Sequence, residues 1–263
     1  MNDERTPNPW ELPSDRSGWL DFCEYVRLVT ADAARLREVA SMGLEAAVPS
    51  CPGWSVGDVV HHTAEVYLHK VACTQLQRSP DPWPPPTHAG RAPMDLFDEA
   101  RAELLAMFAA HGPEDPSHTW WPPEQTVGFW MRRMALETAV HRVDAELAHD
   151  VVTPVDPALA LDGIDELLVA MLAGDDWAEH GTAEPVDAAV RISAAGRSWT
   201  VTLDAGRVDV VEAATADVAV EVAGEPDAVF VWLWGRGDHE RLVLAGDEEV
   251  ALAVRRRVAE ATD

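Results

Sequence analysis

The sequence of 263 residues is poor in positive charge and in cysteine. It has 20 basic and 46 acidic residues, which gives a formal net charge of -26. Phosphate groups are bound by clustered cations, so this balance argues against nucleic acid and anionic membranes as partners. The three cysteines, Cys23, Cys51 and Cys73, form no CxxC pair. We therefore predict neither a disulfide framework nor a cysteine-rich zinc site, and we expect a reducing compartment.

Long apolar runs are also missing. No segment approaches the roughly 18 apolar residues that a membrane span requires. The first twenty residues are polar and contain proline, unlike a secretory signal peptide. We therefore expect a cytoplasmic protein with no membrane partner. A hydrophobic fraction of 47% is typical of a globular chain, and this length allows one large domain or two modest ones.

The first half of the chain shows apolar residues at helical spacing, interrupted by breaks rich in proline. Ser55, followed three residues later by Asp58, predicts a capping-box-like start for the second helix. The loops at 79–93 and 111–125 are rich in proline and tryptophan. Four helices of this length favour a bundle. The expected helices span 18–42, 55–77, 94–110 and 126–149.

After Asp150 the composition changes. The segment VTPVDP predicts a linker, and short β-type segments then alternate with helical ones. We predict an α+β fold in which residues 1–17 form an N-terminal arm, 18–150 a helical bundle and 155–263 a smaller α+β domain. The elements expected in the last domain are helices at 158–173, 226–234 and 248–261, and strands at 189–193, 199–203, 208–211, 218–222 and 242–244.

A candidate metal site begins on the fourth predicted helix, where Glu137 and His141 are four residues apart. Residues at this spacing lie on one face, one turn apart. The rest of that face is largely apolar, and polar groups are costly to bury there unless they are paired or bind a metal. Carboxylate and imidazole suit zinc or a neighbouring divalent ion. A simple helix-stabilising Glu/His pair is the alternative.

The second predicted helix offers further histidines. His62 lies between Val59 and Val66 at helical offsets, which places it on the apolar face. His61 is flanked by acidic residues at the same offsets and should point to solvent, while His69 is a reserve ligand. Three ligands, His62 with Glu137 and His141, would leave a fourth position open, as in catalytic zinc sites. A hydrogen-bonded core histidine is the alternative for His62.

Two sequence blocks resemble those of a known family. Residues 51–62, CPGWSVGDVVHH, resemble the PGW(T/S)VxDLVxH segment of the mycothiol-dependent maleylpyruvate isomerase family. Residues 133–146, RMALETAVHRVDAE, resemble the family's RMAxExxxHRxDAE block. The family belongs to the wider DinB-like superfamily, so the resemblance implies a DinB-like metal-binding four-helix bundle. It also implies His62, Glu137 and His141 as the metal ligands.

The C-terminal part resembles the family's second domain, which is similar to sterol-carrier proteins. The resemblance rests on DGIDEL at 162–167, VWLWGR at 231–236 and the Gly246-Asp247 pair, and in total it covers about residues 18–260. Thr63 replaces an aliphatic residue of the family pattern, and Leu136 stands where a second histidine is frequent. Neither change removes a ligand. The loops at 79–93 and 111–125 are idiosyncratic, and we expect substrate specificity to differ there.

The resemblance implies a divalent metal, zinc first with nickel, cobalt or iron as alternatives, and mycothiol as the thiol cosubstrate. A metal that accepts a thiol lowers its pKa and supplies a thiolate at neutral pH. The expected partner is a small-molecule electrophile. We place a mycothiol S-transferase ahead of a maleylpyruvate cis-trans isomerase, because family members outnumber what one degradation pathway requires. A non-catalytic metal or small-molecule binding protein is the third alternative.

Two more residues are candidates for catalysis. Arg236 is a candidate clamp for a substrate carboxylate, because the resembling family carries a functional arginine in its C-terminal domain and guanidinium binds carboxylates bidentately. Its alternative is a structural role at a helix end. Asp144 is a candidate partner that orients a ligand histidine, with pairing to Arg142 or solvent as the alternative. We expect Trp54 and Trp130 to anchor the core and loops.

Overall fold

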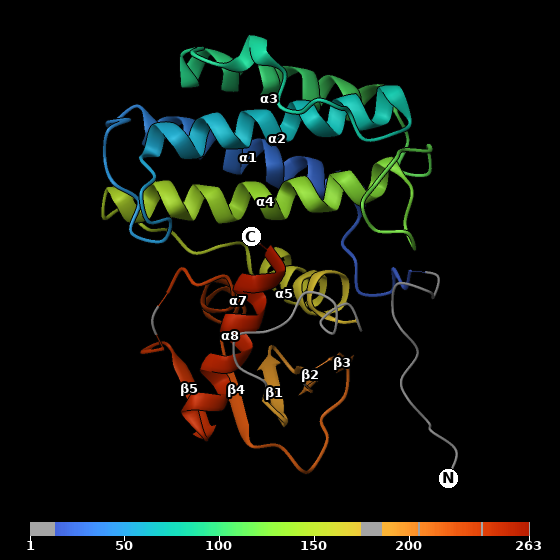
Figure 1. Cartoon of the computed structure of the whole chain (residues 1–263), viewed down its shortest axis with the longest axis vertical. Coiled ribbons are helices and arrows are strands. Elements are labelled where there is room, and N and C mark those ends of the chain that lie inside the picture. The colour runs from blue at the N-terminus through green and yellow to red at the C-terminus, as the bar shows by residue number, and fades with distance from the viewer. Residues whose placement is uncertain (1–13, 175–185, 205, 238, 263) are drawn as a thin grey trace. The chain divides into compact units, whose positions relative to one another are not determined.

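The computed structural model describes residues 14–174, 186–204, 206–237 and 239–262 (Figure 1). The chain divides into two compact units. One consists of Leu20–Pro154, and the other combines Val155–Asp263 with Met1–Trp19. Among the described residues, no helix is long and apolar enough to cross a membrane.

Residues 20–154, all of which the structure describes, form a bundle of four long helices (Figure 1). Helix α2 packs against α3 and α4, and α4 also packs against α1. Aromatic and aliphatic side chains fill the core between them, which supplies the main favourable term in folding. The predicted four-helix architecture is confirmed. The helices are α1 (Phe22–Ala40), α2 (Val56–Leu76), α3 (Pro93–Ala110) and α4 (Val127–Ala148).

The two helices that carry the candidate ligands begin at hydroxyl caps. Ser55 accepts a hydrogen bond from the backbone N–H of Asp58, whose carboxylate accepts one from the Ser55 backbone N–H. This is the predicted capping box, and it satisfies donors that a helix start leaves free. The Thr126 hydroxyl caps α4 by accepting a hydrogen bond from the Phe129 backbone N–H. Both helix starts are therefore encoded locally.

Helix α4 is unusual because it is buried along almost its whole length, including its charged side chains. Buried ionisable groups are rare unless they are paired or bind a metal. Near its C-terminal end, the Arg142 guanidinium pairs with Asp32 and Glu146, and Glu146 also pairs with Arg35. These contacts fix α4 against α1. The buried charges in the middle of α4 belong to a different cluster, described below.

The other unit contains a mixed sheet whose described strands have the order β3-β2-β1-β4-β5. Strands β1 and β4 pair in parallel, and the remaining neighbours pair antiparallel. This unit confirms the predicted α+β fold class. Its elements are α5 (Pro157–Asp165), the π-helix η2 (Glu166–Leu172), β1 (Ala188–Ala194), β2 (Arg197–Leu203), β3 (Val208–Val211), β4 (Val220–Gly224), α7 (Pro226–Leu233), β5 (Leu242–Gly246) and α8 (Glu248–Thr262).

Candidate metal centre

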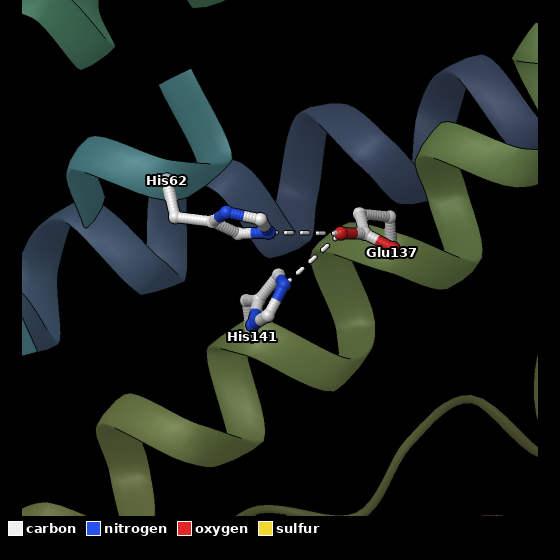
Figure 2. Close-up of side chains that lie close together, drawn as sticks. All are labelled: His62, Glu137 and His141. Atoms are coloured by element: carbon white, nitrogen blue, oxygen red, sulfur yellow. Dashed lines mark hydrogen bonds and ion pairs between the residues drawn. The ribbon is translucent and has the colours of Figure 1, made fainter. Parts of the chain in front are cut away.

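Three side chains from two helices converge inside the bundle: His62 from α2, and Glu137 and His141 from α4 (Figure 2). One ligand atom from each lies within 4.8 Å of the others. Glu137 Oε1 is 3.0 Å from His141 Nε2 and 3.7 Å from His62 Nε2. The structure thus brings together the three residues that the sequence singled out as ligands.

Glu137 is held at the centre of the cluster by two kinds of partner. The Arg133 guanidinium, one turn earlier on α4, pairs with its Oε2, and the two histidines face its Oε1. Burial alone would raise the pKa of Glu137, but the charges of Arg133 and His141 hold that pKa well below its usual value. Glu137 is therefore a carboxylate at neutral pH, with one oxygen turned towards the histidines.

His141 is oriented from its other side by Asp144. The Asp144 carboxylate is completely buried, lies 3.0 Å from His141 Nδ1 and also accepts a hydrogen bond from the Ser50 hydroxyl. Burial would lower the pKa of His141, but the Glu137 and Asp144 carboxylates outweigh it and raise the pKa to about 9. A carboxylate at Nδ1 fixes the ring so that Nε2 points to the cluster, a common arrangement behind metal-binding histidines.

His62 forms the open side of the cluster. Its side chain is 39% exposed, whereas that of His141 is 9% exposed. The His62 ring lies edge-on to the His141 ring at 5.0 Å and to the Trp54 ring at 5.2 Å. A small molecule can therefore approach the cluster from the His62 and Trp54 side, where the indole provides an exposed apolar wall.

The donor set fits a divalent transition metal. Zinc takes imidazole and carboxylate ligands at about 2.0–2.2 Å, which corresponds to about 3.4 Å between ligands in a tetrahedron. The separations of Glu137 Oε1 from His141 Nε2 and from His62 Nε2, 3.0 and 3.7 Å, bracket that spacing. Two imidazoles, one carboxylate and a buried orienting carboxylate are the donor set of a three-ligand site with a free position, and a metal would displace the proton that His141 holds in its absence.

The two other histidines of α2, His61 and His69, have partners of their own. His61 was expected to face solvent, and that expectation is wrong: its ring is half-buried, with Nε2 3.3 Å from the His88 carbonyl and Nδ1 3.8 Å from Glu65. The reason is that the loop after α2 folds back over this face. The reserve ligand His69 lies outside the cluster, and its Nδ1 instead faces the Lys70 ammonium and the Cys73 thiol.

The other residues that the sequence analysis singled out lie outside the three-residue cluster. Arg236 lies in the other unit, where its guanidinium donates to the Trp234 carbonyl and lies over that indole. Trp130 is buried in the core, as expected, and its indole N–H donates to the Ser117 hydroxyl. Trp54 is 37% exposed, so it is not a core residue.

The sequence reasoning gave no role to Arg133 or Lys70. Arg133 stands one helical turn before Glu137, and that i, i+4 spacing was the signal for an ion pair. Lys70 is the single lysine of the chain, and its place on a largely apolar helix was the available signal.

The fold and the donor set define a four-helix bundle with a candidate metal site, joined to an α+β unit. Residues 26–146, which make up most of the bundle, match the family described as the mycothiol maleylpyruvate isomerase N-terminal domain. A search of curated proteins gives no match to this sequence.

Solved structures support the fold of both units. The crystal structure of the mycothiol-dependent maleylpyruvate isomerase is similar over 86% of this chain and 93% of that chain, with 13% identity and a TM-score of 0.59. A histidine-to-alanine mutant of that isomerase gives the same coverage and identity with a TM-score of 0.58. At this identity the likeness establishes the fold. An SCP2-type ubiquinone synthesis protein covers 42% of this chain with a TM-score of 0.27, too low to define the fold of the second unit.

Proposed function

We propose that the protein is a divalent-metal-dependent enzyme that activates mycothiol for attack on a small electrophile. The observation that carries the proposal is the convergence of His62, Glu137 and His141, with Asp144 oriented behind one of the histidines. The match of residues 26–146 to the mycothiol maleylpyruvate isomerase N-terminal domain supports the choice of thiol.

His62, Glu137 and His141 would hold the metal, with zinc first among the candidates. When bound, a divalent metal with a free position acts as a Lewis acid that lowers the pKa of a thiol. Asp144 keeps the His141 ring in place through Nδ1, and Arg133 keeps Glu137 ionised. The Trp54 indole lies edge-on to the His62 ring and forms an apolar wall beside the open side of the site.

The reaction that we place first is S-transfer. The mycothiol sulfur forms a bond to the electrophilic carbon, the thiol proton is released, and a leaving group departs with its electron pair. Where the electrophile is an activated alkene, no group leaves, and the proton ends on the neighbouring carbon. Arg236 of the second unit stays a predicted carboxylate-binding residue, because a guanidinium can bind a carboxylate.

The second candidate is cis-trans isomerisation of maleylpyruvate, which the family name favours. Here the thiol adds to the double bond, the resulting single bond rotates, and elimination returns the thiol. The metal site would serve both reactions, so the fate of the thiol separates them. A non-catalytic binding protein would show neither reaction.

The test is thiol stoichiometry in the presence of zinc and mycothiol, with maleylpyruvate in one arm and 1-chloro-2,4-dinitrobenzene in the other. S-transfer predicts that one thiol is consumed for each product molecule formed. Turnover of maleylpyruvate with catalytic thiol would place isomerisation first. No reaction in either arm above the protein-free rate, with the metal bound, would favour a binding protein.

A further inference from the structure

The only lysine of the chain lies inside the bundle without an acidic partner. The Lys70 ammonium is 4.9 Å from the centre of the Trp130 ring and 3.2 Å from His69 Nδ1. Among the residues that the structure describes, no carboxylate lies within ion-pair distance of it. In a chain with 46 acidic residues, this cation therefore faces an indole and an imidazole and not a carboxylate.

Two electrostatic effects show how the ammonium is held. Burial lowers the pKa of Lys70, and Glu137 partly opposes that shift. Burial and the charge of Lys70 lower the pKa of His69 to about 4, so the His69 ring is neutral at pH 7 and can accept a hydrogen bond. A buried charge is costly unless it is paired, and a neutral imidazole with an indole face gives only part of that compensation.

The position of Lys70 relates it to the candidate metal centre. It follows His62 by eight residues on α2, which corresponds to about 12 Å along the helix axis. Trp130, under the ammonium, precedes Glu137 by seven residues on α4, or about 10 Å. Lys70 and the three candidate ligands therefore lie along one α2–α4 interface, separated by about the length of a small molecule. Lys70 is partly exposed, so this end of the interface is not sealed.

We propose that Lys70 binds the anionic group of the substrate, a carboxylate, and holds the electrophilic carbon towards the metal centre. This inference rests on the proposed function and narrows its substrate class to electrophiles that carry a carboxylate. The ammonium supplies a charge-assisted hydrogen bond to that carboxylate. Lys70 is thus proposed as a residue of the bundle that determines substrate specificity.

The experiment uses succinate as the carboxylate probe and its neutral diamide, succinamide, as the matched control, because neither is an electrophile. Acetylation of Lys70 by acetic anhydride is followed by mass spectrometry on the full-length, zinc-loaded protein. The single lysine makes the modified peptide unique. Succinate should slow acetylation in a saturable manner, and succinamide should leave it unchanged.

Variants extend the test to affinity, measured by calorimetry with succinate. Lys70→Met should weaken succinate binding about tenfold or more, whereas Lys70→Arg should retain it within a few-fold. Arg78→Met, which removes an exposed cation just beyond α2, is the matched control and should bind succinate like the wild type. If Lys70→Met does not fold, the acetylation experiment on the wild type and the succinate affinity of Lys70→Arg still test the inference.

The inference is overturned if succinate does not protect Lys70, if succinamide protects it equally, or if Lys70→Met binds succinate like the wild type. None of these measurements uses thiol or electrophile, so such a failure leaves metal-dependent thiol activation standing. Conversely, protection by succinate in a protein that binds no metal would refute the proposed function and leave carboxylate binding at Lys70 intact.

Discussion

The two ends of the α2–α4 interface differ in how they hold charge. At the donor end (His62, Glu137 and His141), every ionisable group faces an opposite charge or a potential ligand partner. At the cation end (Lys70 and Trp130), the ammonium faces an indole and a neutral imidazole. Both ends are built from the same pair of helices, so the difference comes from single side chains and not from the fold.

Neither end of the interface stabilises the bundle appreciably through its charged groups. Burying an ion pair adds little to the free energy of unfolding, although breaking a buried pair is costly. The charged groups of the donor end therefore contribute little net stability to the bundle. An ammonium buried without a carboxylate lowers stability outright. Both ends therefore make sense as binding groups, one for a metal and the other for an anion, on a bundle whose stability comes from its apolar core.

The largest expected effect comes from removing the cation that balances the donor end. Arg133→Met leaves the largely buried Glu137 carboxylate without its guanidinium, and we expect the metal-free protein to lose about 3–5 kcal/mol of unfolding free energy. Urea denaturation in the presence of a chelator measures this loss. Arg27→Met, which breaks the exposed pair with Glu24, should cost less than about 1 kcal/mol. Equal losses in the two variants would contradict the comparison.

A smaller effect should follow at the residue behind His141. Asp144→Asn removes the carboxylate that orients the ring, and we expect zinc affinity to fall by about 10- to 100-fold. Competition with a chromophoric chelator measures the affinity. Asp98→Asn, which disrupts a partly exposed pair with Arg37 on another face of the bundle, should leave it unchanged. Unchanged affinity in Asp144→Asn would remove Asp144 from the site.

A pH titration of Lys70 tests whether its ammonium is shielded from water. Because burial lowers the pKa of Lys70, its neutral amine is populated at lower pH than that of an exposed lysine. In the Arg78→Lys variant, acetylation of Lys70 should reach half its maximal rate at a lower pH than acetylation of the introduced lysine. Coincident midpoints, followed by mass spectrometry of the two peptides, would show that Lys70 is solvated like a surface residue.

The smallest effect that we expect comes from the helix cap at Ser55, and it should change neither zinc binding nor succinate binding. Ser55→Ala removes the hydroxyl that caps α2 and should cost about 1 kcal/mol of unfolding free energy. Thermal denaturation measures the loss. Zinc stoichiometry and succinate binding should both stay as in the wild type, because neither end of the interface contacts Ser55. Loss of either would mean that the start of α2 positions the site more directly than its contacts indicate.

Much of the fold could be predicted because its signals are local. The Ser55–Asp58 box marks the start of α2 within one residue, and the predicted fold class is confirmed for both units. Strand β4 begins two residues later than predicted, because the alternating Val218, Val220 and Val222 do not show where pairing with β1 starts. The predicted helix 158–173 becomes π-helical from Glu166, which no residue in the sequence signals.

The site was less predictable because it depends on contacts between distant segments. The i, i+4 spacing placed Glu137 and His141 on one face, but the register that brings His62 to them is set by core packing between α2 and α4. The burial of His61 depends on an irregular loop, beyond the reach of helical periodicity. That the three residues bind a metal remains a prediction.

The most direct test of that central claim compares two neighbouring histidines of one helix. Zinc per chain is measured by elemental analysis after reconstitution and gel filtration, in the wild type, His62→Ala and His61→Ala. Our account predicts about one zinc ion in the wild type and in His61→Ala, and a loss of zinc in His62→Ala. Zinc retained in His62→Ala, or none in the reconstituted wild type, would contradict it.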